Sequence, residues 1–307
     1  MLLKHPQLAG VVGLLESRAL PEGGFPARGG DPFRSDATAW AILAMSRSVP
    51  NHPLVDRARD RLAAAQGPDG RVSMSKEHEA AFWPTALSVL AWHGSQAHGP
   101  QCDLGIQFIL RTMGRHWSKI PDAPTGHDPS ISGWPWIDGT HSWIEPTVLS
   151  VLALQVAGHG RHDRVREGIR MILDRQLPHG GWNYGNTMVY GRELHPMPES
   201  TGAALAGLAG QAEQGTVARS LDYLQSEVGR LRTPISLGWG LLGLAAWDRW
   251  PSNGGALVER CLANQTRYGE YDTSALCLLL LAALEEEAGG HKTLFSRVTH
   301  PPSEVHH

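Results

Sequence analysis

A short phrase that recurs along the chain constrains the fold more than any other feature of the sequence. Its fullest copy is a Gly-Gly-aromatic turn that ends at Trp182, followed after a loop by Glu199-Ser200-Thr201 and a run of small and apolar residues. An acidic residue, any residue and a threonine open this run, and related steps return along the whole chain. Repetition at intervals of several tens of residues is typical of arrays of one supersecondary unit. Internal repetition therefore decides the fold.

The copies alternate with segments of a second kind. Aligned on the acid-x-Thr step, the six copies begin at Asp36, Trp83, Glu145, Glu199, Pro234 and Asp272. Each leads into a segment that is apolar nearly all round, which predicts a buried helix. Six amphipathic, charged segments lie between them, at about 5–18, 53–66, 103–113, 163–176, 216–228 and 255–265. An apolar set shielded by a two-faced set predicts an all-α (α/α)6 toroid, with six inner and six outer helices.

One interval of the repeat is much longer than the others and predicts an insertion at about 116–142. This stretch contains Trp117, Trp134 and Trp136, and such aromatic content argues against disorder. Because a long loop inside a compact fold is usually functional, we expect it to fold over one mouth of the toroid. A second long loop is predicted at 183–197. The sequence predicts one domain over 1–290 and a tail at 291–307.

Composition excludes some classes of partner. The chain has 307 residues, 41% hydrophobic, and a formal net charge of -3, which offers no polybasic surface for nucleic acid. Three cysteines without metal-type spacing predict a reducing, cytoplasmic location. No signal peptide is predicted. The longest apolar run, 275–284, is too short to span a bilayer, so any membrane contact is expected to be peripheral.

The repeat resembles that of a known superfamily. Gln176 before Gly180-Gly181-Trp182, and then a helix that opens acid-x-Thr-Ala, resembles the repeat of terpenoid cyclases, protein prenyltransferase β subunits and prenyltransferase/squalene-oxidase repeat proteins. The resemblance covers roughly residues 5–285. It implies the same toroid and a linear isoprenoid as the ligand. It is specific for fold more than for activity, because one fold serves several functions.

The resemblance also implies a catalytic residue. In squalene cyclases the proton donor belongs to a DxDD motif that leads into Thr-Ala, and Asp36 falls on that donor. Arg34 and Ala37 stand where the motif has its other acids. Because a nearby arginine lowers the pKa of a carboxyl group, the alternatives for Asp36 are a helix cap or an ion pair with Arg34. Arg34 is alternatively a diphosphate ligand.

Glu145 is the second candidate acid. It follows the Trp-rich insertion and precedes Pro146 at the start of a predicted helix. A carboxyl group packed among tryptophans is expected to lose hydration and to have a raised pKa, as a tuned general acid does. The alternative is an acid favoured at a helix start by the helix dipole.

Other residues near the same mouth are predicted to bind the substrate. They are Trp40, Trp83, Trp136, Trp143, Trp182, Arg34, Asp138, His141, Glu199 and Asp272. Aromatic faces suit cationic intermediates of an isoprenoid reaction. No metal and no cofactor are predicted, because the Asp-x-Cys pair of zinc-dependent prenyltransferases and helical His ligand spacing are missing.

Three functions fit these patterns. The first is an enzyme of the isomerase or lyase type that cyclises a linear isoprenoid after protonation by Asp36 or Glu145. The second is a non-catalytic toroid that binds an isoprenoid or docks a protein. The third is a transferase that uses a prenyl diphosphate, since inner-helix N-termini attract anions.

Overall fold

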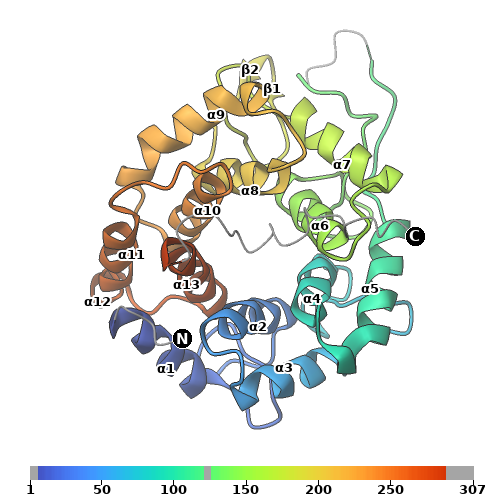
Figure 1. Cartoon of the computed structure of the whole chain (residues 1–307). Helices are drawn as coiled ribbons and strands as arrows, with labels where there is room; N and C mark the ends of the chain where they lie inside the picture. The colour runs from blue at the N-terminus through green and yellow to red at the C-terminus, as the bar shows by residue number, and fades with distance from the viewer. Residues whose placement is uncertain (1–5, 121–125, 288–307) are drawn as a thin grey trace, which may run out of the picture.

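The structure is a computed structural model that describes residues 6–120 and 126–287. Its helices form two concentric rings (Figure 1), which confirms the predicted toroid. The inner ring consists of α2 (Ser35–Ser48), α4 (Pro84–Trp92), α6 (Ile144–Val156), α8 (Pro198–Leu208), α10 (Pro234–Ala245) and α13 (Thr273–Glu287). The outer ring consists of α1 (Pro6–Arg18), α3 (Pro53–Ala63), α5 (Gly99–Arg111), α7 (Asp163–Asp174), α9 (Gln214–Glu227) and α11 (Gly254–Ala263).

Short elements lie in the connections. They are the 3-10 turns η1 (Gln96–His98) and η2 (Val228–Arg230), the single turn α12 (Gln265–Tyr268), and a hairpin of β1 (Met188–Val189) and β2 (Arg192–Glu193). The hairpin occupies the predicted loop at 183–197. The predicted tail at 291–307 lies outside the described residues.

The two rings differ in how their helices are buried. In α10 every residue from Leu237 to Ala245 is buried, as expected for a helix with neighbours on all sides. In α7 the buried residues are Val165, Gly168, Met171 and Ile172, whose spacing of three or four places them on one face. The hydrophobic pattern in the sequence therefore matches the layer in which each helix lies.

A side-chain clamp explains the threonine of the repeat. The Thr147 hydroxyl accepts a hydrogen bond from the Trp134 backbone N–H at 3.0 Å and donates to the Trp134 carbonyl at 3.4 Å. Thr201 makes the same pair of bonds with Trp182, at 3.0 and 3.4 Å. Thr38 and Thr85 do so with Phe25 and Val72. Each clamp ties the start of an inner helix to the turn that precedes it.

The aromatic residue of the turn completes this connection. The Trp182 indole N–H donates to the Ile172 carbonyl at 2.7 Å, and the Trp134 indole N–H donates to the Ile109 carbonyl at 2.9 Å. Both carbonyls belong to the last turn of an outer helix, where backbone acceptors lack partners within the helix. One indole therefore caps an outer helix while its backbone is held by the next inner helix.

The structure corrects the alignment of the last two copies. The backbone N–H of Thr38 bonds the carbonyl four residues earlier, and Leu237 and Leu276 make this bond in α10 and α13. By helix position, Leu237 and Leu276 thus stand where the other copies have threonine. The alignment of copies that begin at Pro234 and Asp272 had placed Ser236 and Ser274 there. Apolar side chains make no clamp at these positions, so the helix start is the more reliable reference.

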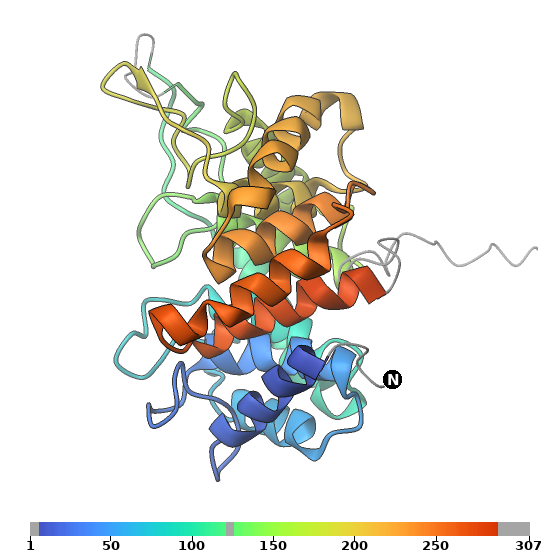
Figure 2. The same ribbon diagram turned by 90° about the vertical axis from the view of Figure 1, so that its left-hand side faces the viewer.

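The long connections gather at one end of the ring (Figure 2). The predicted insertion returns along this end, where the Asp138 backbone N–H donates to the Ala80 carbonyl at 2.9 Å. The hairpin of β1 and β2 projects from the same side. Cys102, Cys261 and Cys277 are buried and free. Over the described part of the chain, no helix combines the length and apolarity that crossing a membrane requires.

Candidate active site at the mouth of the ring

Three carboxyl groups share one position in the repeat. Asp36, Glu145 and Glu199 each stand two residues before a clamping threonine, in the first turn of α2, α6 and α8. Trp83 has the same place beside α4. Because the clamps fix the starts of these helices, the four side chains lie at the same end of the ring. We call this end the mouth.

Glu145 has the most perturbed carboxyl group at the mouth. It keeps some accessible surface, but protein atoms surround it so densely that lost hydration is the largest effect on its pKa. A hydrogen bond from Trp239 opposes this effect, and the nearby Glu199 charge adds to it. The net effect raises the pKa of Glu145 to about 7. The predicted elevation agrees with the structure, and Glu145 can hold a proton near neutral pH.

Glu199 is held in a different environment from Glu145. The Tyr184 hydroxyl donates to Glu199 Oε1 at 2.9 Å, and the Ser236 hydroxyl donates to Glu199 Oε2 at 2.8 Å. Thr233 in turn donates to the Ser236 hydroxyl at 2.8 Å. Each carboxylate oxygen therefore accepts a hydrogen bond, an arrangement that suits the ionised form. The mouth thus places Glu145, which can hold a proton near neutral pH, beside a carboxyl group that accepts a hydrogen bond at each oxygen.

Tyr184 connects the two carboxyl groups. It lies on the loop after Trp182, and its carbonyl accepts a hydrogen bond from the Ile144 N–H at 2.8 Å. This bond attaches the loop to the first residue of α6, next to Glu145. Partial loss of hydration, the hydrogen bond to Glu199 and the charges of Glu199 and Glu145 raise the pKa of Tyr184. Its hydroxyl therefore stays protonated and acts as a donor.

Two pairs of tryptophans lie at or below the mouth. Trp40 of α2 and Trp239 of α10 meet edge to face, with ring centroids 5.9 Å apart, and both are buried. Because α13 lies between α2 and α10 in the inner ring (Figure 1), this contact joins two helices that are not neighbours in the ring. Trp83 and Trp136 form a second edge-to-face pair at 5.0 Å, and both are partly exposed. The insertion thereby supplies an aromatic wall on the side of α4.

A pocket of about 580 Å³ opens beside Glu199. It lies between the starts of α8, α10 and α13, and its lining includes Glu199, Ile235, Ser236, Tyr268 and Asp272. This volume falls within the usual range for small-molecule sites. A ligand in this pocket would lie next to the carboxylate that is hydrogen-bonded to Tyr184.

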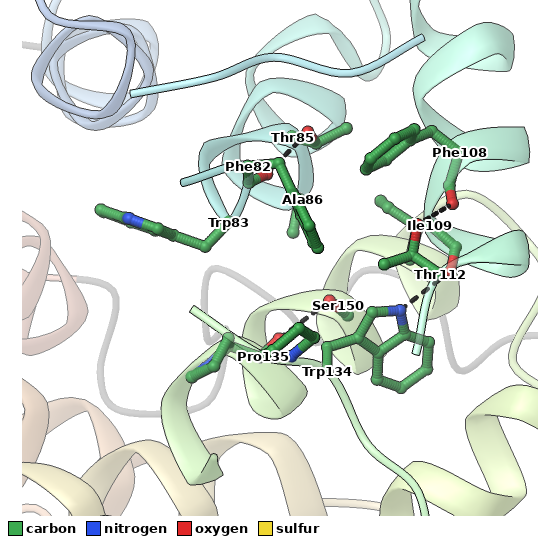
Figure 3. A pocket seen from close by; sticks show the side chains of 11 residues that line it. Phe82, Trp83, Thr85, Ala86, Phe108, Ile109, Thr112, Trp134, Pro135 and Ser150 are labelled. Atoms are coloured by element: carbon green, nitrogen blue, oxygen red, sulfur yellow. Dashed lines mark hydrogen bonds between the residues drawn. The ribbon is translucent and has the colours of Figure 1, made fainter. Parts of the chain in front are cut away.

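A second, much smaller gap lies between α4, α5 and α6 (Figure 3). Its volume is about 10 Å³, and Phe82, Phe108 and Trp134 line it. This space admits about one water molecule. It is a packing gap between the two rings and too small for a substrate.

Asp36 forms the ion pair that its sequence context left open. Arg34 Nε and Nη2 donate to the two Asp36 carboxylate oxygens at 2.9 and 2.8 Å. Both Asp36 oxygens therefore accept charge-assisted hydrogen bonds from one guanidinium group. Arg34 is thus engaged with Asp36. The geometry favours Glu145 over Asp36 as the group that carries a proton.

Other predicted binding residues have surroundings unlike that of Glu145. Trp182 has no exposed surface, so it offers none to a ligand. Asp272 caps α13 through the Ala275 N–H at 2.8 Å, and it also lines the pocket. Asp138 is exposed on the insertion. His141 packs on Trp143 with ring centroids 4.2 Å apart.

The environment of His141 also differs from that of Glu145. Burial and the Arg175 charge lower the pKa of His141. The same charge, after burial, helps lower the pKa of His127 to about 4. His141 therefore lies in the electrostatic environment of His127 and Arg175, which favours the neutral form of both imidazoles.

The sequence analysis missed Tyr184, Ser236 and Trp239. Tyr184 follows the Gly-Gly-Trp turn by two residues, and Trp239 lies in the fifth copy of the repeat, but neither position carries a chemical motif. Only the closing of the ring brings them to Glu145 and Glu199. Within residues 6–120 and 126–287, no three His, Cys, Asp or Glu side chains are grouped closely enough to hold a metal ion.

Comparisons with known proteins define the class of fold. No protein-family model matches the sequence, and no curated protein matches it. Solved structures do match, and they show that this chain is an α/α toroid of the kind found in terpene cyclases and in mannanases.

Three of these structures illustrate the match. Type II terpene cyclase MstE from Scytonema has a TM-score of 0.57 at 11% identity, over 93% of this chain and 100% of that chain. The α-1,6-mannanase from Salegentibacter sp. HEL1_6 has a TM-score of 0.62 at 11% identity, over 92% and 98%. A protein from Actinoplanes has a TM-score of 0.57 at 15% identity, over 90% and 98%.

Proposed function

We propose that the protein is an enzyme of the type II terpene-cyclase kind, which protonates a linear isoprenoid and lets it cyclise. The observation that carries the proposal is Glu145, whose pKa is raised to about 7 at the mouth of the ring. A general acid works best when its pKa lies near the working pH. MstE, which shares the fold, is a type II terpene cyclase solved with geranylgeranyl dihydroxybenzoate as substrate.

The reaction needs only a proton donor and a shaped aromatic surface. Glu145 would transfer its proton to one carbon of a terminal alkene, whose π electrons form the new C–H bond. The neighbouring carbon becomes a cation, and a second alkene of the same chain attacks it to close a ring. A final deprotonation restores an alkene, so atoms and charge balance.

The surroundings of Glu145 suit this chemistry. Trp239 is hydrogen-bonded to Glu145, and the Trp83–Trp136 pair lies at the same mouth. Aromatic faces stabilise cations by electrostatic attraction. The Glu199 carboxylate adds a negative charge near the reacting centre, and its basic oxygens could accept the last proton.

The charges at the mouth weigh against a transferase that uses a prenyl diphosphate. Diphosphate is an anion, and helix N-termini can bind it. Here Glu145 and Glu199 occupy two of these N-termini, and Arg34 is paired with Asp36. A diphosphate at this place would meet the negative charge of Glu199 and would find no free arginine in Arg34.

Hydrolysis of a glycosidic bond is a second candidate, supported by one specific observation. Glycosidases use two carboxyl groups in unlike environments, one protonated and one ionised. Glu145 and Glu199 form such a pair, and an α-1,6-mannanase shares the fold. The apolar and aromatic character of the mouth makes this the weaker candidate.

One turnover experiment separates the candidates. The purified protein is incubated with linear isoprenoids, their aryl conjugates and diphosphates, and α-1,6-mannooligosaccharides, and products are resolved by mass. A cyclised isomer that disappears in Glu145→Gln and persists in Glu213→Gln, at an exposed residue before α9, would support the proposal. Shortened oligosaccharides would favour the glycosidase. An isoprenoid recovered unchanged, without any product, would indicate a binding protein and overturn the proposal.

A further inference from the structure

The hydrogen-bond network around Glu199 suggests a role for a residue that sequence analysis assigned only to substrate binding. Tyr184 and Ser236 each bind one oxygen of its carboxylate, at 2.9 and 2.8 Å, and Thr233 supports Ser236. A side chain held at both oxygens cannot turn freely. Its charge is therefore fixed in place at the start of α8.

This fixed charge faces Glu145 from the neighbouring inner helix. Helices α6 and α8 pack directly against each other, and both residues lie in the first turn. Glu199 is the charged residue that acts on Glu145, and it disfavours a second negative charge there. Trp239, from α10, donates a hydrogen bond that acts in the opposite direction. From α2, Asp36 is already neutralised by Arg34.

We infer that Glu199 is a positioning residue for Glu145, and that Tyr184 and Ser236 hold its carboxylate where it keeps Glu145 protonated. The inference rests on the proposed function, since it assigns Glu145 as the acid. It adds that three chain segments, the loop after Trp182, α8 and α10, adjust the acid in addition to the larger effect of lost hydration. In this role Glu199 acts through Glu145, separately from the final deprotonation of the proposed reaction.

The Trp239 indole gives a direct test that does not require turnover. Because this N–H bonds Glu145, its ¹H–¹⁵N resonance should titrate with Glu145; the resonance is assigned by its loss in Trp239→Phe. The midpoint is expected near the value of about 7 in the native protein. In Glu199→Gln it should fall by about one pH unit, because the repulsion is removed while the lost hydration remains.

Matched variants make the test decisive. Asp272→Asn removes a carboxylate from the same pocket and should move the midpoint by less than about 0.3 units, since Asp272 is not among the groups that act on Glu145. Tyr184→Phe and Ser236→Ala keep the Glu199 charge but release it, and each should give a smaller shift in the same direction. An unchanged midpoint in Glu199→Gln, or an equal shift in Asp272→Asn, would overturn the inference.

The outcome is separable from that of the proposed function. If the midpoint shifts as expected but no substrate is cyclised, then the positioning role stands and the cyclase proposal fails. If cyclisation depends on Glu145 but the midpoint is unchanged in Glu199→Gln, then the cyclase proposal stands and the positioning role fails.

Discussion

Single side chains determine the acid at the mouth and the hydrogen-bonded clamps between helices. Glu145 is the acid. Its pKa is raised from 4.5 to about 7, mainly because burial removes water from the charged form. The folded state therefore binds a proton more tightly than the unfolded chain does. The stabilisation is complete below pH 4.5 and is lost as the pH rises through 7.

This linkage predicts that the native protein loses stability as the pH rises, relative to a variant that lacks the Glu145 carboxyl group. Glu145→Gln carries no charge at any pH, so its free energy of unfolding should exceed that of the native protein at pH 8, by on the order of 2 kcal/mol. At pH 4.5 the two should agree closely. Urea denaturation at both pH values measures the difference. A gap of equal size at both would show that glutamine acts through packing alone. In the proposed reaction, turnover by the native protein should likewise decline above pH 7, where the acid form of Glu145 disappears.

Thr147 is an example of the threonine clamp at the start of an inner helix. It is fully buried and makes two hydrogen bonds with the Trp134 backbone. Thr147→Val keeps the shape but leaves a buried N–H without a partner, which should cost about 1–3 kcal/mol of unfolding free energy. Thr112→Val, at a partly exposed threonine that bonds only within its own helix turn, is the control and should cost less. Calorimetric or urea unfolding gives both values, and equal losses would contradict the clamp.

Pairs of helices set the distances between functional groups. Inner helices α8 and α10 approach so closely that a Cβ on Gly202 would lie 2.2 Å from the Trp239 carbonyl oxygen. The side chain of Trp239 is the hydrogen-bond donor to Glu145. A residue chosen for helix packing thus also determines the environment of the acid.

Substitution at this contact should therefore affect stability and site together. In Gly202→Ala the new methyl group pushes the backbones of α8 and α10 apart. Overpacking of this kind lowers the free energy of unfolding by about 1–3 kcal/mol or more. The Trp239 indole resonance should shift at the same time. Gly215→Ala is the matched control, because nothing lies within 4 Å of its Cβ. In α9 it should be neutral or slightly stabilising. A stable Gly202→Ala protein with an unmoved resonance would refute the coupling.

The molecule as a whole depends on closing the ring between its first and last helices. Arg18 of α1 is buried and donates to the Tyr271 carbonyl at 2.9 Å and to the Thr273 hydroxyl at 3.4 Å. The Thr273 N–H donates to the Ala27 carbonyl at 2.8 Å. Contacts this distant in sequence are costly to form, since a long loop must close first.

Removing the Arg18 side chain should weaken the closure. Arg18→Ala leaves buried acceptors without a donor and should lower the unfolding free energy by about 2–4 kcal/mol. Arg219→Ala removes an exposed arginine that also bonds a carbonyl, at 3.0 Å, and should cost under about 1 kcal/mol. Urea denaturation compares them. Hydrogen exchange of α1 and α13 should rise together in Arg18→Ala, and a rise confined to α1 would argue against a closure contact.

The sequence by itself determined the architecture of this protein, because the apolar and amphipathic segments alternate and each must be buried on a particular face. It also placed Asp36, Glu145 and Glu199 at the starts of inner helices, through the acid-x-Thr step. Only the tertiary structure decided which of these acids can hold a proton. Asp36 is paired with Arg34, whereas Glu145 is enclosed between Trp239 and Glu199.

The sequence pattern could not predict the contacts of Tyr184 and Ser236 with Glu199. A pKa and a hydrogen-bond network depend on distances between side chains that lie far apart in the sequence. Tyr184, Glu199 and Ser236 meet because a loop and two helices converge at one end of the ring. Repeat spacing predicts the helices and their burial, but it does not predict which side chains meet across the mouth.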